Sequence, residues 1–259
     1  MTIHIMLDLE TWGTTPGSDI RSIGACVFDP ATGHVAQPDH AYIGTPGWFY
    51  VATDNPLTQI TGYMNDCGER RKYRLDRTPA TVQWWSEQSD EAQAAFVDPV
   101  DLKVALGKFS NWLCDLVSAP YTTSHGHTGI TIWSHGASFD PPILAAAYEA
   151  VGLPVPWHYR APRDTRTLFD VAGIDDHSAW LAQHPGPLGV SHHALDDAIC
   201  QARAVCAAYA RLTVPHDAMK EAFRAGYRQS SEDERNDGTP YPTWGVNKGF
   251  DKWMRERGT

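Results

Sequence analysis

The chain has 259 residues, of which 42% are hydrophobic, which is enough for one large folded domain or a domain with an appendage. No stretch approaches the ~18 uninterrupted apolar residues of a membrane span, and the first residues lack the basic segment and cleavage site of a secretory signal. The formal charge of −10 disfavours a non-specific duplex binder that relies on a broad basic surface. It does not exclude an enzyme whose carboxylates bind metal ions.

The cysteines indicate a reducing compartment. They are odd in number and widely spaced, and most of them fall in segments expected to be strands or helices. This pattern is typical of reduced thiols in a cytoplasm, and not of a disulfide framework. We therefore expect a soluble cytoplasmic protein. The cysteines are Cys26, Cys67, Cys114, Cys200 and Cys206.

The first part of the chain is expected to form short strands. Apolar alternation predicts a strand over residues 3–11, and further strands are expected over 20–30 and 34–43. The turn sequence DPATGH lies between the second and third of these, which favours an antiparallel, hairpin-rich beginning. Residues 44–78 contain Gly, Pro, Asn and a charged run. We expect them to form a long surface insertion with little regular structure.

Helices are expected next along the chain. The segment TPATVQWWSEQSDEAQAAF, residues 78–96, predicts one helix with Thr78 as its N-cap and Pro79 at its first position. Residues 101–117 carry apolar residues at spacings of three and four, which predicts a second helix.

The second half of the chain alternates strand and helix. Residues 129–136 predict a buried strand that ends in a glycine turn, and residues 140–152 and 192–212 predict helices. Strands that alternate with helices after an antiparallel hairpin indicate an α/β domain with a mixed sheet. We place this domain at residues 1–212, followed by a helical and loop extension over 213–259.

Carboxylates occur where an apolar pattern would not place them. Asp8 and Glu10 share one face at the end of the first strand, where their repulsion is costly unless a cation lies between them. Asp140 follows a buried strand, and Asp197 lies at the edge of the buried face of the last helix. His192 precedes Asp197 by five residues and would diverge from it by roughly 140° within one helix. If both act together, His192 must therefore lie in the loop before the helix.

Four carboxylates in one pocket require cations, and hard oxygen ligands favour Mg²⁺ or Mn²⁺ over zinc. Two such ions some ~3.5–4 Å apart are the usual device for displacement at a phosphate. A nearby histidine that titrates near neutrality can take the proton from the attacking water. The pattern therefore favours metal-dependent phosphodiester chemistry.

Three short motifs in the same order resemble the exonuclease motifs of the DEDDh superfamily, which includes RNase T, oligoribonuclease and the bacterial proofreading subunit. They are DLET at 8–11, SFD at 138–140 and HHALDDA at 192–198. The resemblance covers roughly residues 3–212. A closer resemblance is to the exonuclease VIII-like branch of bacteria and phages. It rests on SIGACVFDPATG (22–33), QWW (83–85), PWHYR (156–160) and RDTRTL (163–168).

The resemblance implies an RNase H-like fold and 3′→5′ exonucleolysis of single-stranded DNA or RNA ends to nucleoside 5′-monophosphates. It implies two Mg²⁺ or Mn²⁺ ions and a histidine general base, and the base would be His192. The metal ligands would be Asp8, Glu10, Asp140 and Asp197. Homodimers are common among the resembling families, and the compartment would be the host cytoplasm if a phage encodes the protein.

The same resemblance implies contacts to the terminal nucleotide from the main chain of Leu9 and from Thr11, with Trp12 following at the same point. Phe139 would be a platform for base stacking. At least one of Trp84 and Trp85 is expected to pack in the core, while Trp85 is the candidate for the edge of the nucleotide pocket.

Several residues keep a second interpretation. His193 rivals His192 but could instead cap the helix or lie on the surface, and Asp196 is expected to be a solvated helix residue. Asp164 could be a fifth ligand, but we expect it to cap a helix that begins at Thr165. Three arginines could equally contact phosphate or pair with acidic surface residues. They are Arg160, Arg163 and Arg166.

Two other classes of function compete with an exonuclease. One is a nucleic-acid-binding module that has the fold without the chemistry, and the other is an RNase H-like endonuclease. Intact ligands at all four acidic positions argue against the first, and the size of the products would distinguish the second. The choice between DNA and RNA depends on surroundings of the terminal 2′-position that the sequence does not reveal.

Overall fold

A computed structural model describes residues 2–38, 46–54, 75–117 and 129–213, together with the backbone of 63–64 and 70–71. The chain divides into two compact units, Met1–Ala210 and Arg211–Thr259. The expected extension after residue 213 lies outside the described residues. No helix in the described part of the chain combines the length and the apolar character needed to cross a membrane.

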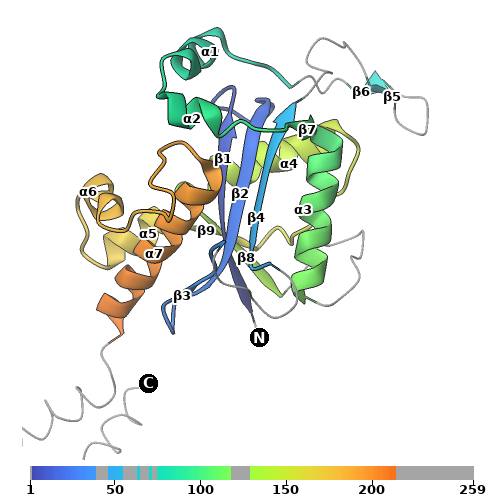
Figure 1. Ribbon diagram of the computed structural model, residues 1–259. Coiled ribbons are helices and arrows are strands. Elements are labelled where there is room, and N and C mark those ends of the chain that lie inside the picture. Colours follow the sequence, from blue (N-terminus) through green and yellow to red (C-terminus); the bar gives the residue numbers. More distant parts are fainter. Residues whose placement is uncertain are drawn as a thin grey trace, which may run out of the picture. The chain divides into compact units, whose positions relative to one another are not determined.

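A seven-stranded mixed sheet forms the centre of the first unit, with strand order β7-β4-β2-β1-β8-β9 and β3 paired to β2 (Figure 1). Strand β2 runs antiparallel to β1, β3 and β4, whereas β1, β8 and β9 run parallel. The strands are β1 Ile3–Thr11, β2 Ile20–Asp29, β3 His34–Val35, β4 Trp48–Asp54, β7 Val100–Asp101, β8 Ile130–Ser134 and β9 Pro162–Asp164. A separate pair joins β5 Tyr63–Met64 and β6 Arg70–Arg71.

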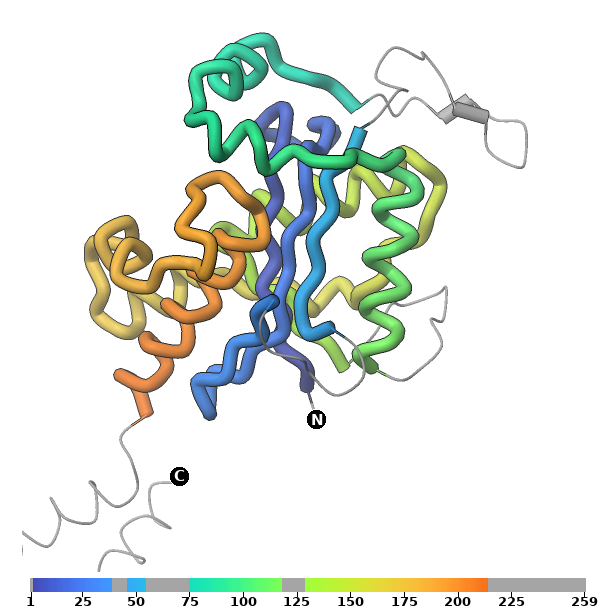
Figure 2. Tube along the Cα trace, viewed as in Figure 1, coloured from blue at the N-terminus to red at the C-terminus, as the bar shows by residue number. Residues whose placement is uncertain are grey.

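Helices cover both faces of this sheet (Figures 1 and 2). Helices α3 and α4 pack on one face through a core that includes Leu7 and Phe109. Helices α5, α6 and α7 lie on the other face, around Met6 and Phe28. This is the α/β architecture expected from the sequence, and the predicted RNase H-like fold is confirmed. The helices are α1 Pro79–Ser86, α2 Asp90–Ala94, α3 Leu102–Val117, α4 Asp140–Ala150, α5 Thr165–Val171, α6 His177–Ala182 and α7 Ala194–Leu212.

Strand β1 shows why the acidic pair lies where it does. Its side chains alternate between the two faces. Leu7 and Leu9 therefore belong to the core under α3 and α4, while Met6 belongs to the core under α7. Asp8 and Glu10 follow the direction of Met6, so both carboxylates project toward α7.

A glycine in β2 brings α7 close to this pair. Gly24 pairs with Asp8 in the antiparallel register. A Cβ atom at Gly24 would lie 2.1 Å from the carbonyl carbon of Ala194, the first residue of α7. Because only hydrogen fits there, α7 begins directly against the sheet and presents its first turn to the end of β1.

Two expectations about the chain were wrong. Residues 44–78 are not a structureless insertion throughout, since Trp48–Asp54 form β4, a strand of the central sheet paired with β2. Nor do residues 78–96 form one helix. The chain leaves the helical path after Ser86, and Ser89 begins α2 by accepting a hydrogen bond from the amide of Ala92 at 3.3 Å. Most of the remaining insertion lies outside the described residues. The strand expected over 34–43 ends at Val35, and residues 39–43 lie outside the described residues.

Candidate active site

The end of β1 holds the first two carboxylates. Asp8 Oδ1 accepts a 2.7 Å hydrogen bond from Nε2 of Gln201 in α7, which fixes one of its two oxygens. Glu10 is buried, with 8% of its surface exposed. The register shifts immediately after Glu10, because Glu10 pairs with Ser22 while Thr11 pairs with Ile20. This bulge ends the regular pairing at the site.

The third carboxylate belongs to α4. Strands β1 and β8 are parallel, so their carboxyl ends meet at the same edge of the sheet. After β8 the chain turns at Gly136, whose φ of +121° suits glycine, and Asp140 then begins α4. Asp140 is 4% exposed, and its Oδ1 accepts a 3.1 Å hydrogen bond from the amide of Leu9.

The fourth carboxylate and the histidine come from the start of α7. His192 lies in the loop before the helix, as helical geometry required, and has the left-handed φ of +62°. Its amide donates a 3.0 Å hydrogen bond to Oδ2 of Asp197. One potential ligand atom from each of Glu10, His192 and Asp197 lies within 4.8 Å of the others. The structure thus brings the histidine and two predicted ligands to one point.

The electrostatics of these carboxylates follow from burial and crowding. Burial, followed by the nearby charge of Asp197, raises the pKa of Glu10 to about 8. Burial also raises the pKa of Asp140 to about 7 and that of Asp197 to about 6. Burial and three neighbouring carboxylates raise the pKa of Asp8 well above its ordinary value. Such a cluster favours protons or cations between its members.

Burial acts on His192 in the opposite direction. It lowers the pKa of the imidazole, because the charged form is the one that burial disfavours. The ring is therefore neutral near pH 7 and has a nitrogen able to accept a proton.

A cavity of about 440 Å³ opens beside the carboxylates. Its walls come from the end of β1, from α1 and from Phe139. Trp84 is 40% exposed, and its ring stands edge-on to the His192 ring with centroids 4.8 Å apart. The lining residues are Leu9, Glu10, Thr11, Gly13, Thr14, Ala80, Thr81, Trp84, Trp85 and Phe139. The cavity thus combines aromatic side chains with the carboxylate of Glu10.

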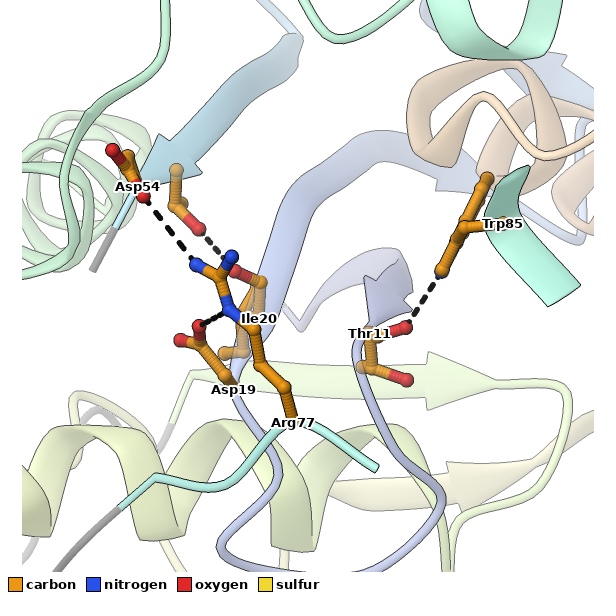
Figure 3. A network of polar contacts seen from close by, with 7 residues as sticks. Thr11, Asp19, Ile20, Asp54, Arg77 and Trp85 are labelled. Atoms are coloured by element: carbon orange, nitrogen blue, oxygen red, sulfur yellow. Dashed lines mark hydrogen bonds and ion pairs between the residues drawn. The ribbon is translucent and has the colours of Figure 1, made fainter. Parts of the chain in front are cut away.

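Trp85 forms a buried part of the wall of this cavity. Only 3% of it is exposed, and its Nε1 donates a 2.9 Å hydrogen bond to the carbonyl oxygen of Thr11 (Figure 3). The guanidinium of Arg21, the extra residue of the bulge in β2, lies 4.2 Å from its ring centroid. The charge of Arg21 also opposes the rise in the pKa of Glu10.

The segment before α1 is anchored to the sheet by Arg77. Its Nε donates to Asp19 at 2.8 Å, and its Nη2 lies 3.4 Å from Asp54 at the end of β4 (Figure 3). The amide of Thr78 then donates to the carbonyl oxygen of Trp12 at 2.7 Å. These contacts hold α1 over the carboxyl end of β1.

The residues expected to contact substrate divide into two groups. Leu9, Thr11, Phe139 and Trp85 line the cavity, although the amide of Leu9 is already bonded to Asp140. Trp12 does not line it. Its ring packs edge-on to Trp85 at 6.3 Å and near the guanidinium groups of Arg21 and Arg77. Their roles in binding stay predictions.

The alternatives for the neighbouring residues are now decided by their contacts. Asp164 accepts a 2.9 Å hydrogen bond from the amide of Arg166, which confirms it as the N-cap of α5. Nδ1 of His193 accepts from the amide of Asp196 at 3.3 Å, so His193 caps α7. Asp196 is not solvated as expected but buried, because its carboxylate accepts hydrogen bonds from the loop before α7.

Three residues of the site were missed as site residues by sequence reasoning. Trp84, and not only Trp85, lines the cavity. Gln201 follows Asp197 by four residues, a helical spacing that places both on one face and could have revealed it. Arg21 gave no such signal, because its position depends on a bulge.

The family of the chain follows from its sequence match. A model described as the 3′-5′ exoribonuclease Rv2179c-like domain matches residues 3–209. The chain belongs to the Rv2179c-like family. Residues 3–209 therefore match a 3′–5′ exonuclease domain, as the sequence motifs predict, while the closer resemblance to the exonuclease VIII-like branch stays a prediction. No curated protein sequence matches the chain.

Solved structures with similar folds include several nucleases. Cell-death related nuclease 4 (CRN-4) is 13% identical with a TM-score of 0.47, and the match covers 78% of this chain and 62% of CRN-4. This chain therefore spans less than two thirds of that protein. The nuclease domain of 3′hExo, a DEDDh family member bound to rAMP, is 12% identical with a TM-score of 0.44, covering 79% and 90%. Exonuclease I of E. coli with a dT13 oligonucleotide is 16% identical with a TM-score of 0.39, covering 82% and 41%.

Proposed function

We propose that this enzyme removes nucleotides one at a time from the 3′ end of single-stranded nucleic acid and releases nucleoside 5′-monophosphates. The observation that carries the proposal is the convergence of ligand atoms of Glu10, His192 and Asp197 within 4.8 Å, beside an aromatic-walled cavity that Glu10 also lines. RNA is the substrate we favour, because the family that matches the chain is described as exoribonuclease domains.

The donor set suits divalent cations. The four carboxylates crowd one another, and burial raises the pKa of each, so the site gains most from bound positive charge at neutral pH. Hard carboxylate oxygens favour Mg²⁺ or Mn²⁺. We propose that Asp8, Glu10, Asp140 and Asp197 hold two such ions. When bound, the ions supply an activated water and compensation for the charge of the leaving oxygen.

The chain's own groups do the remaining work. His192 is neutral near pH 7 and acts as the general base that takes a proton from the attacking water. Phe139 and Trp84 hold the terminal base by stacking, which is tolerant of base identity. Trp85, bonded to Thr11 and stacked on Arg21, keeps that wall in place. Gln201 holds one oxygen of Asp8 and leaves the other to face the site.

The compartment and the assembly state belong to the same proposal. Cys26, Cys200 and Cys206 are free thiols, as suits the reducing cytoplasm that we propose. A homodimer remains the expected assembly by analogy with the resembling families, and light scattering at a series of concentrations measures it.

Degradation ladders of labelled strands test the proposal. RNA and DNA of the same sequence, each labelled at the 5′ end, are incubated with Mg²⁺, Mn²⁺ or EDTA. We expect a ladder that shortens by single nucleotides from the 3′ end, faster on RNA, absent in EDTA and absent in Asp197→Asn. Glu149→Gln, on the exposed face of α4, is the matched control and keeps wild-type activity. Internal cuts from the start of the reaction, or full activity of Asp197→Asn, would contradict the proposal.

A further inference from the structure

A second carboxylate of α7, that of Asp196, accepts hydrogen bonds from the loop that carries His192. We call residues 183–193, between α6 and α7, the His192 loop. Asp196 is 3% exposed, and its two oxygens accept hydrogen bonds from amides of this loop, Oδ1 from Leu188 at 2.8 Å and Oδ2 from Val190 at 3.0 Å. Both oxygens of one buried side chain are thus used to hold a segment that precedes it by six to eight residues.

Further contacts fix the position of the same loop against the carboxylate of Asp196. A Cβ atom at Gly186 would lie 2.3 Å from Oδ1 of Asp196, so the backbone of the loop approaches the carboxylate directly. His193 closes the other end, because its Nδ1 accepts from the amide of Asp196 at 3.3 Å and its ring stacks on Tyr50 with centroids 4.4 Å apart. The loop is therefore fixed on both sides of His192.

The backbone conformation of His192 requires such constraints. Its φ of +62° is a left-handed conformation that residues other than glycine seldom adopt, and such a conformation persists only where the surroundings impose it. The hydrogen bond from its amide to Asp197 is one constraint. The hydrogen bonds from the amides of Leu188 and Val190 to Asp196 are the other constraint, because they fix the course of the backbone that leads to His192.

We propose that Asp196 is a positioning residue for the nuclease reaction, which holds the His192 loop so that the imidazole faces Glu10 and Asp197. The inference rests on the proposed role of His192. Two adjacent aspartates then have different tasks, since Asp197 faces the reacting groups while Asp196 faces away and acts only through the loop.

The test is a double-mutant cycle with Asp196→Asn and His192→Ala, measured as kcat and KM on a 3′-labelled single strand. An asparagine keeps the shape but offers one acceptor oxygen where two are used. We expect Asp196→Asn to lower kcat by about tenfold or more, with KM within about twofold, because general base catalysis depends on alignment. In the His192→Ala background the same substitution adds no further loss, because Asp196 acts through His192. Asp176→Asn, which removes a similar carboxylate-to-amide bond at the start of α6, leaves kcat unchanged.

If Asp196→Asn folds poorly, amide hydrogen exchange and a second variant still test the positioning role of Asp196. Leu188→Pro removes one of the two donors at a position that is 55% exposed, and it leaves Asp196 intact. We expect lower kcat and faster exchange across residues 188–193 in both variants.

The outcomes separate the two proposals. Wild-type kcat in both variants, or an equal loss from Asp196→Asn with and without His192, overturns the positioning role. Full activity of His192→Ala instead overturns the proposed function.

Discussion

Glu10→Gln tests the electrostatic account of the site most sharply. In the metal-free protein, the folded state keeps a proton on Glu10 up to about pH 8, whereas an ordinary glutamate loses it near 4.5. A folded state that binds more protons than the unfolded state loses stability as the pH rises. The stabilising contribution is therefore complete below pH 4.5 and disappears as the pH passes 8. A carboxylate whose pKa rises from 4.5 to about 8 loses roughly 3 kcal/mol of unfolding free energy between pH 5 and pH 8, and Glu10 shares this loss with the carboxylates around it.

Urea unfolding in EDTA, followed by tryptophan fluorescence from pH 5 to pH 8, measures this loss. Wild type should become less stable as the pH rises. Glu10→Gln should unfold at about the wild-type urea concentration at pH 5 and at a higher one at pH 8, because glutamine does not titrate. Added Mn²⁺ should restore wild-type stability at pH 8 more than it stabilises the variant. Glu149→Gln should follow wild type throughout. A flat or rising wild-type profile, or an equal slope in Glu10→Gln, would refute the reasoning.

Three further substitutions test the wall of the cavity, the hydrogen bond from Gln201 to Asp8, and the close packing of α7 on β2 at Gly24. Trp84→Ala should raise KM by roughly tenfold, because base stacking contributes about 1–3 kcal/mol. It should not lower the unfolding temperature, because this ring is partly exposed. An unchanged KM would show that Trp84 does not contact the substrate. Gln201→Leu should raise the Mn²⁺ concentration for half-maximal activity by about 10- to 100-fold, because Asp8 loses its donor; an unchanged titration would show that Gln201 does not orient Asp8. Gly24→Ala should destabilise the fold by about 1–3 kcal/mol through its clash with Ala194, whereas Gly107→Ala, with nothing near its Cβ, should not; equal unfolding midpoints would contradict this packing.

The arrangement of the candidate site residues was predictable where local geometry decides it. The period of two in β1 placed Asp8 and Glu10 on one face, and the period of the helix required His192 to precede the helix if it acts together with Asp197. The parallel pairing of β1 and β8 then brings Asp140 to the same edge of the sheet. The first two inferences needed only the regular geometry of a single strand or helix, whereas the place of Asp140 depends on the pairing of two strands.

What failed depends on contacts between distant segments. Strand β4 directly follows proline and glycine, which favoured a loop, and its place in the sheet comes from its pairing with β2. Adjacent aspartates look alike in sequence, and Asp196 is buried only because the His192 loop folds back over it. Likewise, the carbonyl oxygen of Thr11 accepts a hydrogen bond from the indole of Trp85, which is buried, whereas Trp84 stays partly exposed in the same cavity.

Identification of the first product released from a 3′-labelled RNA strand tests the central claim most directly. The strand is incubated with Mn²⁺ and either wild type or Asp8→Ala, whose folding is checked by circular dichroism, and the labelled product is identified by mass spectrometry. We expect wild type to release the label as a nucleoside 5′-monophosphate before any longer fragment, and Asp8→Ala to release none. A labelled oligonucleotide as the first product, or mononucleotide release by a folded Asp8→Ala, would contradict the claim.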